Sequence, residues 1–122
     1  MIARSLFDTV GMFDESLPAC EDYDLWLRIS CYFPVYLVDR SLVIKRGGHA
    51  DQLSRLPGLD RYRIQALNKI IASDQLSKKQ HNAAVKTLQK KCQIFSKGCL
   101  HRGRKEEGGY YADLAERYRT KA

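Results

Sequence analysis

The sequence lacks long hydrophobic runs and the standard phosphate-binding motifs. No apolar run approaches the roughly 20 residues that a membrane-spanning helix needs, and the first eight residues lack the apolar core of a signal peptide. The glycine-rich patterns G-x-x-x-x-G-K-[ST] and G-x-G-x-x-G are missing, as is a recognisable Ser-His-Asp arrangement. We therefore expect a cytoplasmic protein, with peripheral membrane contact as a further option, and no nucleotide loop of the common kinds.

The cysteines form no recognisable zinc or redox motif. The chain has four of them and three histidines, with no C-x-x-C and no zinc-like spacing: Cys20, Cys31, Cys92, Cys99, His49, His81 and His101. Free, mostly buried thiols in a reducing compartment are therefore expected rather than disulfides.

Charge is distributed unevenly along the 122 residues, a length that suits one small domain. Up to Asp51 there are five basic and eight acidic residues, and after it there are sixteen basic and six acidic. The net charge of +7 therefore belongs to the C-terminal part. This part could contact phosphates, a lipid surface or an acidic partner, or it could be a solvated lysine-rich helix face.

The first half of the chain predicts two short helices and two short strands. Residues 3–10 form the first helix, which Gly11 ends, and residues 19–31 form the second, with acids early in the helix where its dipole favours them. The β-rich runs 35–38 and 42–44 predict strands that form a hairpin or join a sheet from elsewhere.

The second half predicts three helices. Residues 60–71 carry one apolar stripe, Ser77-Lys-Lys-Gln80 resembles a capping box that opens a helix reaching Gly98, and residues 104–118 form the last helix. The stripe of the middle helix starts at His81, which we interpret as a partly covered residue at the core edge. The predicted fold class is α+β, mainly α, with a three-helix, bundle-like C-terminal part.

Two stretches could carry chemistry. Glu21, Asp22 and Asp24 stand next to Trp26, the single tryptophan, and this pattern fits either a helix start or a carboxylate positioned as a general base. The second stretch, residues 45–54, follows a predicted strand and combines cations, a diglycine, a histidine and a carboxylate. It could bind phosphate or a metal-bound diphosphate, or it could be a linker with solvated charges.

A family resemblance rests on three strings of residues. Val10-Gly-Met-Phe-Asp-Glu15 precedes Cys20-Glu-Asp-Tyr-Asp-Leu-Trp-Leu-Arg28, and Lys45-Arg-Gly-Gly-His49 follows with Asp51-Gln-Leu-Ser54. Together they resemble the C-terminal, acceptor-side half of a family 2 glycosyltransferase with the GT-A fold. The resemblance covers about residues 4–54. It implies an acceptor-side fragment at residues 1–54 and a basic helical extension at residues 55–122.

The resemblance implies roles for individual residues. Asp22 would be the base that deprotonates an acceptor hydroxyl as it attacks a nucleotide-sugar with inversion, and Glu21 would be its companion. Residues 25–27 would pack the helix and hold the acids in place. Arg46 and His49 would contact the donor diphosphate, and His49 would be a metal ligand. The implied enzyme is a hexosyltransferase of cell-surface or exopolysaccharide synthesis that uses Mn²⁺ or Mg²⁺.

The family's nucleotide-binding half has no counterpart in the sequence. Its metal-binding Asp-x-Asp is absent as a separate motif, because Asp22-Tyr-Asp24 belongs to the acceptor string. We therefore expect a truncated enzyme that alone binds no metal and transfers no sugar, with strand edges open to a second copy. The alternative is a non-enzymatic helical module whose basic C-terminal face binds an anionic partner; nucleic acid is not the expected one.

Overall fold

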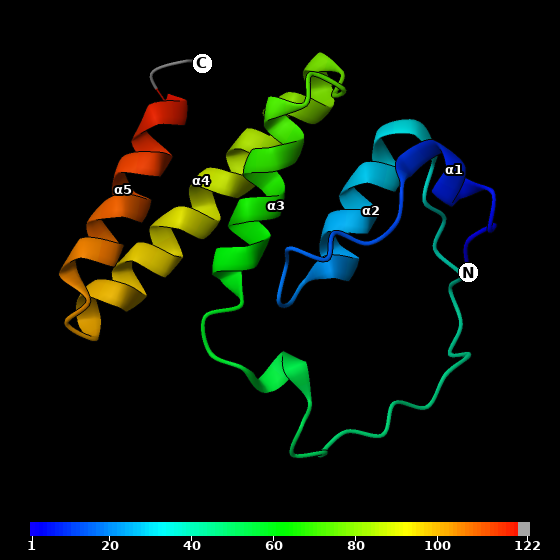
Figure 1. Cartoon of the computed structure of the whole chain (residues 1–122), viewed down its shortest axis with the longest axis horizontal. Coiled ribbons are helices and arrows are strands. Elements are labelled where there is room, and N and C mark those ends of the chain that lie inside the picture. Colours follow the sequence, from blue (N-terminus) through cyan, green and yellow to red (C-terminus); the bar gives the residue numbers. More distant parts are fainter. Residues whose placement is uncertain (120–122) are drawn as a thin grey trace.

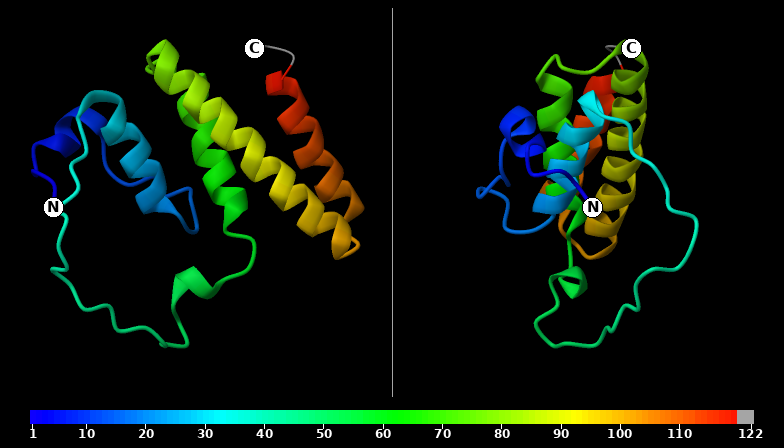
Figure 2. Two further views of the ribbon diagram at one scale, coloured as in Figure 1. Left: turned by 180° about the vertical axis from the view of Figure 1, so that it is seen from behind. Right: turned by 90° about the vertical axis from the view of Figure 1, so that its right-hand side faces the viewer.

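The computed structural model describes residues 1–119, and within them it contains helices and connecting segments (Figure 1). The elements in chain order are α1 (Leu6–Val10), α2 (Glu21–Tyr32), the 3₁₀ helix η1 (Leu53–Arg55), α3 (Asp60–Ala72), α4 (Lys78–His101) and α5 (Lys105–Arg119). Figures 1 and 2 show α3, α4 and α5 side by side, with α2 lying on the other side of α3.

The predicted α+β class is wrong, because the described residues contain no strand. Residues 35–38 and 42–44, which we expected as two short strands, belong to a long extended connection between α2 and η1. Their apolar side chains are 60 to 88% exposed. β-Branched and aromatic residues favour strands when they can pack against neighbouring strands, and within residues 1–119 no strand lies beside them.

The core lies between the three C-terminal helices, as their apolar stripes predict. Its buried members come from α3, α4 and α5, namely Ile64, Leu67, Ile71, Leu88, Cys92, Phe95, Cys99, Leu114 and Ala115. Tyr111 packs edge-on against Phe95 with ring centroids 4.7 Å apart, a favoured geometry for aromatic pairs. The prediction of free cysteines is also confirmed, because all four are unpaired.

The predicted capping box of α4 and the predicted end of α1 at Gly11 are confirmed, whereas the prediction for His81 is wrong. Ser77 accepts a hydrogen bond from the Gln80 amide, and the Gln80 side chain accepts one from the Ser77 amide, which completes the capping box. Gly11 ends α1 with a φ of 80°. His81 is exposed rather than partly covered, because the buried stripe of α4 begins further along the helix.

An ion cluster attaches the N-terminal part to the bundle. Asp24 in α2 is 1% exposed, and its carboxylate lies 2.5 Å from the Lys69 Nζ of α3 and 3.1 Å from the Arg28 Nε. Lys69 also reaches Asp14 at 2.7 Å. A charge buried to this degree needs partners of opposite sign, and both bases supply them.

Arg28 extends this cluster to the segment before α2. Its guanidinium donates hydrogen bonds to the backbone oxygens of Val10 and Met12, the second at 2.7 Å. The turn after α1 is therefore held against α2 and, through Asp24 and Lys69, against α3. Tyr23 and Leu27 add apolar contact between α2 and the core, so the two predicted parts of the chain touch directly.

None of the helices within residues 1–119 has the length and the apolar character that crossing a bilayer requires.

Gly108 tests the packing of α5 on α4. A methyl group at this position would lie 2.7 Å from the Leu100 Cγ and 3.2 Å from the Ser96 backbone oxygen. We expect Gly108→Ala to lower the free energy of unfolding by about 1–3 kcal/mol through overpacking.

Gly109→Ala is the matched control, because its methyl group meets no atom within 4 Å. The control should gain up to about 1 kcal/mol from helix propensity, and urea titration of both variants would measure the difference. Equal effects would contradict the close approach.

Lys69→Met tests the ion cluster. The change leaves Asp24 buried with Arg28 alone, so we expect a loss of about 3 kcal/mol in unfolding free energy at neutral pH. Lys97→Met, which removes an exposed lysine of α4, is the control and should change little.

The effect of Lys69→Met should depend on pH with a defined sign. The hydrogen bond from Lys69 is the main cause of a pKa of Asp14 well below its usual value. The Asp14–Lys69 stabilisation is therefore complete above the unfolded pKa of about 3.9 and is lost as the pH falls through the lower folded value. Chemical denaturation at several pH values should show the wild-type advantage shrinking below about pH 4. An advantage that grows in acid would contradict this account.

Candidate functional site

A hollow of about 220 Å³ lies at the N-terminal end of α2. Segments far apart in the sequence meet there, and its lining consists of Ala19, Cys20, Glu21, Asp22, Leu53, Ser54, Leu59 and Arg63. Both acids that we expected to carry chemistry are among them. The hollow also contains the end of the second candidate stretch, residues 45–54, so the structure brings part of both stretches together.

The three acids of α2 divide between two environments. Glu21 is half-buried and Asp22 is exposed at the hollow, whereas Asp24 is buried in the ion cluster with Arg28 and Lys69. The Asp22 Oδ1 accepts a hydrogen bond of 2.7 Å from the Tyr23 amide in the first turn. This bond leaves the other carboxylate oxygen of Asp22 available to accept a further hydrogen bond, and Asp22 itself lines the hollow.

The backbone conformation of Cys20 sets the direction in which α2 starts beside the hollow. Its backbone is left-handed, with φ 61° and ψ 25°, a conformation that is uncommon for a residue other than glycine. Its thiol lies 3.7 Å from the Leu59 carbonyl oxygen and donates to it. Burial raises the pKa of this thiol, so it stays protonated at neutral pH and holds the start of α2 beside the start of α3.

Arg63 also lines the hollow, although the sequence did not predict it as a site residue. Its guanidinium donates to the Asp60 Oδ1 at 3.0 Å, and this hydrogen bond is the main cause of a raised Arg63 pKa. Burial acts to raise the pKa of Asp60, but the hydrogen bonds from Arg63 and Lys91 outweigh it and lower the value. The i, i+3 spacing from Asp60 to Arg63 is a local signal for a helix ion pair, but no local signal places Arg63 near Asp22.

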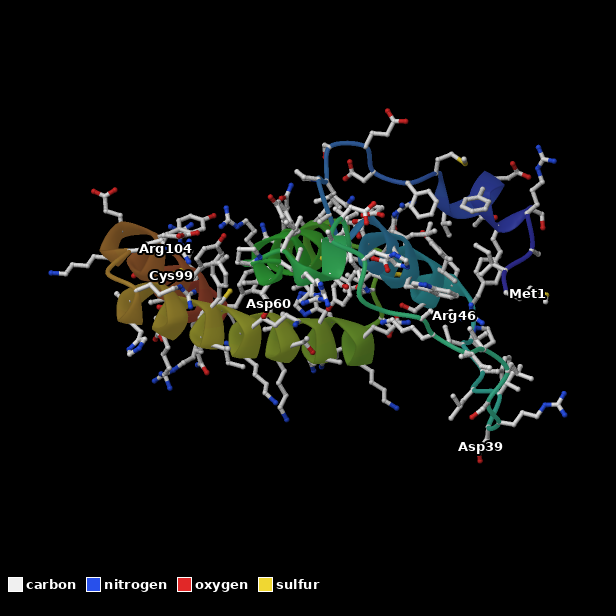
Figure 3. All side chains as sticks on the ribbon, turned by 90° about the horizontal axis from the view of Figure 1, so that it is seen from below. Met1, Asp39, Arg46, Asp60, Cys99 and Arg104 are labelled. Carbon is white, nitrogen blue, oxygen red and sulfur yellow. The ribbon has the colours of Figure 1, made fainter. Side chains whose placement is uncertain are left out.

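Arg46 and His49 lie on the extended connection, with exposed side chains, and neither lines the hollow. Figure 3 labels Arg46 on this connection. Leu53 and Ser54, at the end of the same stretch, do line it. The predicted contacts of Arg46 and His49 with a diphosphate stay predictions.

The described residues do not by themselves fit a metal site. Within residues 1–119 no group of three or more His, Cys, Asp and Glu side chains is close enough to hold an ion. The hollow offers two carboxylates next to the Arg63 cation, which opposes a second cation there. The expected role of His49 as a metal ligand therefore stays a prediction.

Trp26 differs from the expected role of an apolar anchor. We expected residues 25–27 to pack α2 and hold the acids, but Trp26 is 43% exposed. Leu25 is buried and Leu27 packs against the core cluster, so these two residues pack α2 as predicted, whereas their role in holding the acids stays a prediction.

Comparison with known proteins finds relatives among proteins named as glycosyltransferases. An uncharacterized glycosyltransferase of Rickettsia prowazekii (strain Madrid E) is 32% identical over 101 residues, which are 83% of this chain and 27% of that protein. Uncharacterized glycosyltransferases of Rickettsia conorii and Rickettsia felis are 43% and 38% identical over 55 residues, 45% of this chain and 9% of each relative. No protein-family model and no solved structure matches the chain.

These matches establish a coarse relationship. The chain spans about a quarter of the length of the Rickettsia prowazekii relative and about a tenth of the other two. The printed names go no further than glycosyltransferase, so family 2 membership and the GT-A fold stay predictions. What the comparisons support is a relationship between this chain and glycosyltransferases.

Proposed function

We propose that the chain is the acceptor side of a glycosyltransferase and that Asp22 is its general base. The observation that carries the proposal is the hollow at the start of α2, where Asp22 and Glu21 face the same space as Ser54 and Arg63. The relationship to proteins named as glycosyltransferases supports the reaction class.

The proposed reaction transfers a hexose from a nucleotide-sugar to an acceptor hydroxyl with inversion. The acceptor oxygen attacks the anomeric carbon, the bond from that carbon to the diphosphate oxygen breaks, and the nucleoside diphosphate leaves with the electron pair. The acceptor proton passes to the Asp22 carboxylate. General-base assistance of this kind contributes about 10²–10⁴-fold to a rate.

Neighbouring residues position the acceptor and the base. Glu21 and Ser54 line the hollow and can hydrogen-bond sugar hydroxyls, and Arg63, which also lines it, supplies further donors. The left-handed turn at Cys20 fixes the direction of the first turn of α2. Positions held in this way matter because a base acts within hydrogen-bonding distance of the proton it removes.

Other residues would bind the donor nucleotide-sugar. Arg46 and His49 would reach the diphosphate through movement of the extended connection, and Mn²⁺ or Mg²⁺ would be bound by the nucleotide-binding half of the complete enzyme. Cell-surface or exopolysaccharide synthesis is the proposed pathway class. The reaction step assigned to Asp22 does not depend on any of these points.

Asp22→Asn tests the base in a chimera. The chain would replace the aligned 101-residue segment of the Rickettsia prowazekii relative, and release of nucleoside diphosphate from radiolabelled UDP- and GDP-hexoses would be followed with a lipid-linked glycan extract as acceptor. We expect the Asn variant to lose about 10²–10⁴-fold in turnover with an intact fold, because the amide accepts the Tyr23 hydrogen bond but takes no proton.

Asp113→Asn is the matched control, because Asp113 is an exposed acid on α5 away from the hollow. Its turnover should equal that of the unmodified chimera. Full activity of the Asp22 variant would remove Asp22 as the base, and a chimera that binds no nucleotide-sugar and transfers none would remove the proposed function.

A further inference from the structure

The solvent-facing side of α4 carries a straight row of lysines, which we call the lysine ridge: Lys79, Lys86, Lys90 and Lys97. All four are exposed. At 3.6 residues per turn these positions project within about 40° of one another. They lie opposite the buried stripe that includes Leu88 and Cys92, so the ridge marks the outer edge of the bundle.

Acidic residues do not neutralise this ridge. The 24 residues of α4 include no aspartate or glutamate. Within residues 1–119 none of the four lysines forms an ion pair. Other bases of the bundle behave differently: Lys69 and Lys91 are paired with carboxylates of α2 and α3. Four of the sixteen basic residues of the C-terminal part therefore lie along one line without a carboxylate partner in the described part of the chain.

The ridge combines charge with exposed apolar surface. Its ends are eighteen residues apart, which gives a length of about 27 Å at 1.5 Å per residue. Ile94 is 57% exposed and lines a shallow hollow together with Lys86 and Lys90. Asp60 lines this hollow too, and its carboxylate is paired with Lys91 and Arg63 rather than with the ridge. Figure 3 shows nitrogen-tipped side chains of α4 projecting away from the other helices, so a flat anionic surface can approach without obstruction from the bundle.

The extended connection between α2 and η1 projects to the same side. In Figure 3 the segment labelled Asp39 lies on the side to which the α4 side chains point, and the right-hand view of Figure 2 shows the connection bowing outward past the α4 ribbon. Residues 35–38 and 42–44 of this connection expose their apolar side chains. A surface with anionic groups outside and hydrocarbon beneath is complementary to both features.

Nucleic acid fits the same face less well. α4 contains no arginine, and its one aromatic residue, Phe95, is buried. Single-stranded nucleic acid is held by aromatic stacking and by arginine as well as by charge, and specific duplex contacts favour bidentate arginine. Lysines alone are hydrated point charges, which suit diffuse attraction to lipid headgroups.

We propose that the lysine ridge of α4 is a docking surface for a bilayer containing anionic phospholipid, and that the connection at residues 35–44 inserts its apolar side chains beside it. This surface is separate from the hollow at the start of α2, so it goes beyond the proposed sugar transfer. Docking would place the protein at the surface where lipid-linked molecules are available.

Lys86→Gln/Lys90→Gln in the full chain tests the ridge. The probe is sedimentation with vesicles of phosphatidylcholine mixed with phosphatidylglycerol, at several salt concentrations. Each lysine near an anionic surface contributes about a fivefold factor, so the double variant should bind about 25-fold more weakly. Arg4→Gln/Lys105→Gln is the matched control, because it removes two exposed cations outside the ridge and should retain most of the binding.

The proposal is supported if the wild type binds mixed vesicles, binds them more weakly as the salt concentration rises and does not bind vesicles of pure phosphatidylcholine. Circular dichroism would confirm that both double variants keep their helices. Equal binding to neutral vesicles, or equal losses in the two double variants, would overturn it. Tight binding to duplex DNA or to RNA without binding to anionic vesicles would also overturn it and would assign the ridge to nucleic acid.

Discussion

The buried carboxylate of Asp24 is the constraint on which the arrangement of this protein depends. It is one of the largest fully buried side chains, and its charge is balanced by Lys69 from α3 and by Arg28 from its own helix. Breaking such a pair leaves an uncompensated charge in the interior, which costs about 3–5 kcal/mol. Because Lys69 also binds Asp14, α2 and the segment before it are held on the bundle as one assembly.

This constraint gives the acids of α2 two different roles. Asp24 points into the protein and fixes the helix, while Asp22 and Glu21, within the same turn, face the hollow. A helix held at its buried side can present a carboxylate at a fixed position, which is what general-base chemistry requires. The proposed glycosyltransferase role therefore rests on a structural acid next to a reactive one. The lysine ridge lies on another helix and would serve a separate purpose.

Helices and their inner faces could be predicted from the sequence because the signals are local. The stripes of α3 and α5 and the capping box of Ser77 follow from spacing alone. Long-range partners could not be predicted in this way: nothing near Asp24 in the sequence identifies Lys69, and nothing near Asp22 identifies Arg63. The strands expected at residues 35–44 failed because strand formation depends on neighbouring strands, which a propensity pattern does not reveal.

Equilibrium unfolding of Asp22→Asn and Asp24→Asn, measured side by side, tests the division of roles most directly. Asp22 is exposed and its replacement keeps the acceptor for the Tyr23 amide, so its unfolding free energy should stay within about 1 kcal/mol of the wild type. Asp24→Asn removes the charge between two cations and should cost about 3 kcal/mol or more. A tolerated Asp24 variant, or an equally damaging Asp22 variant, would contradict this account.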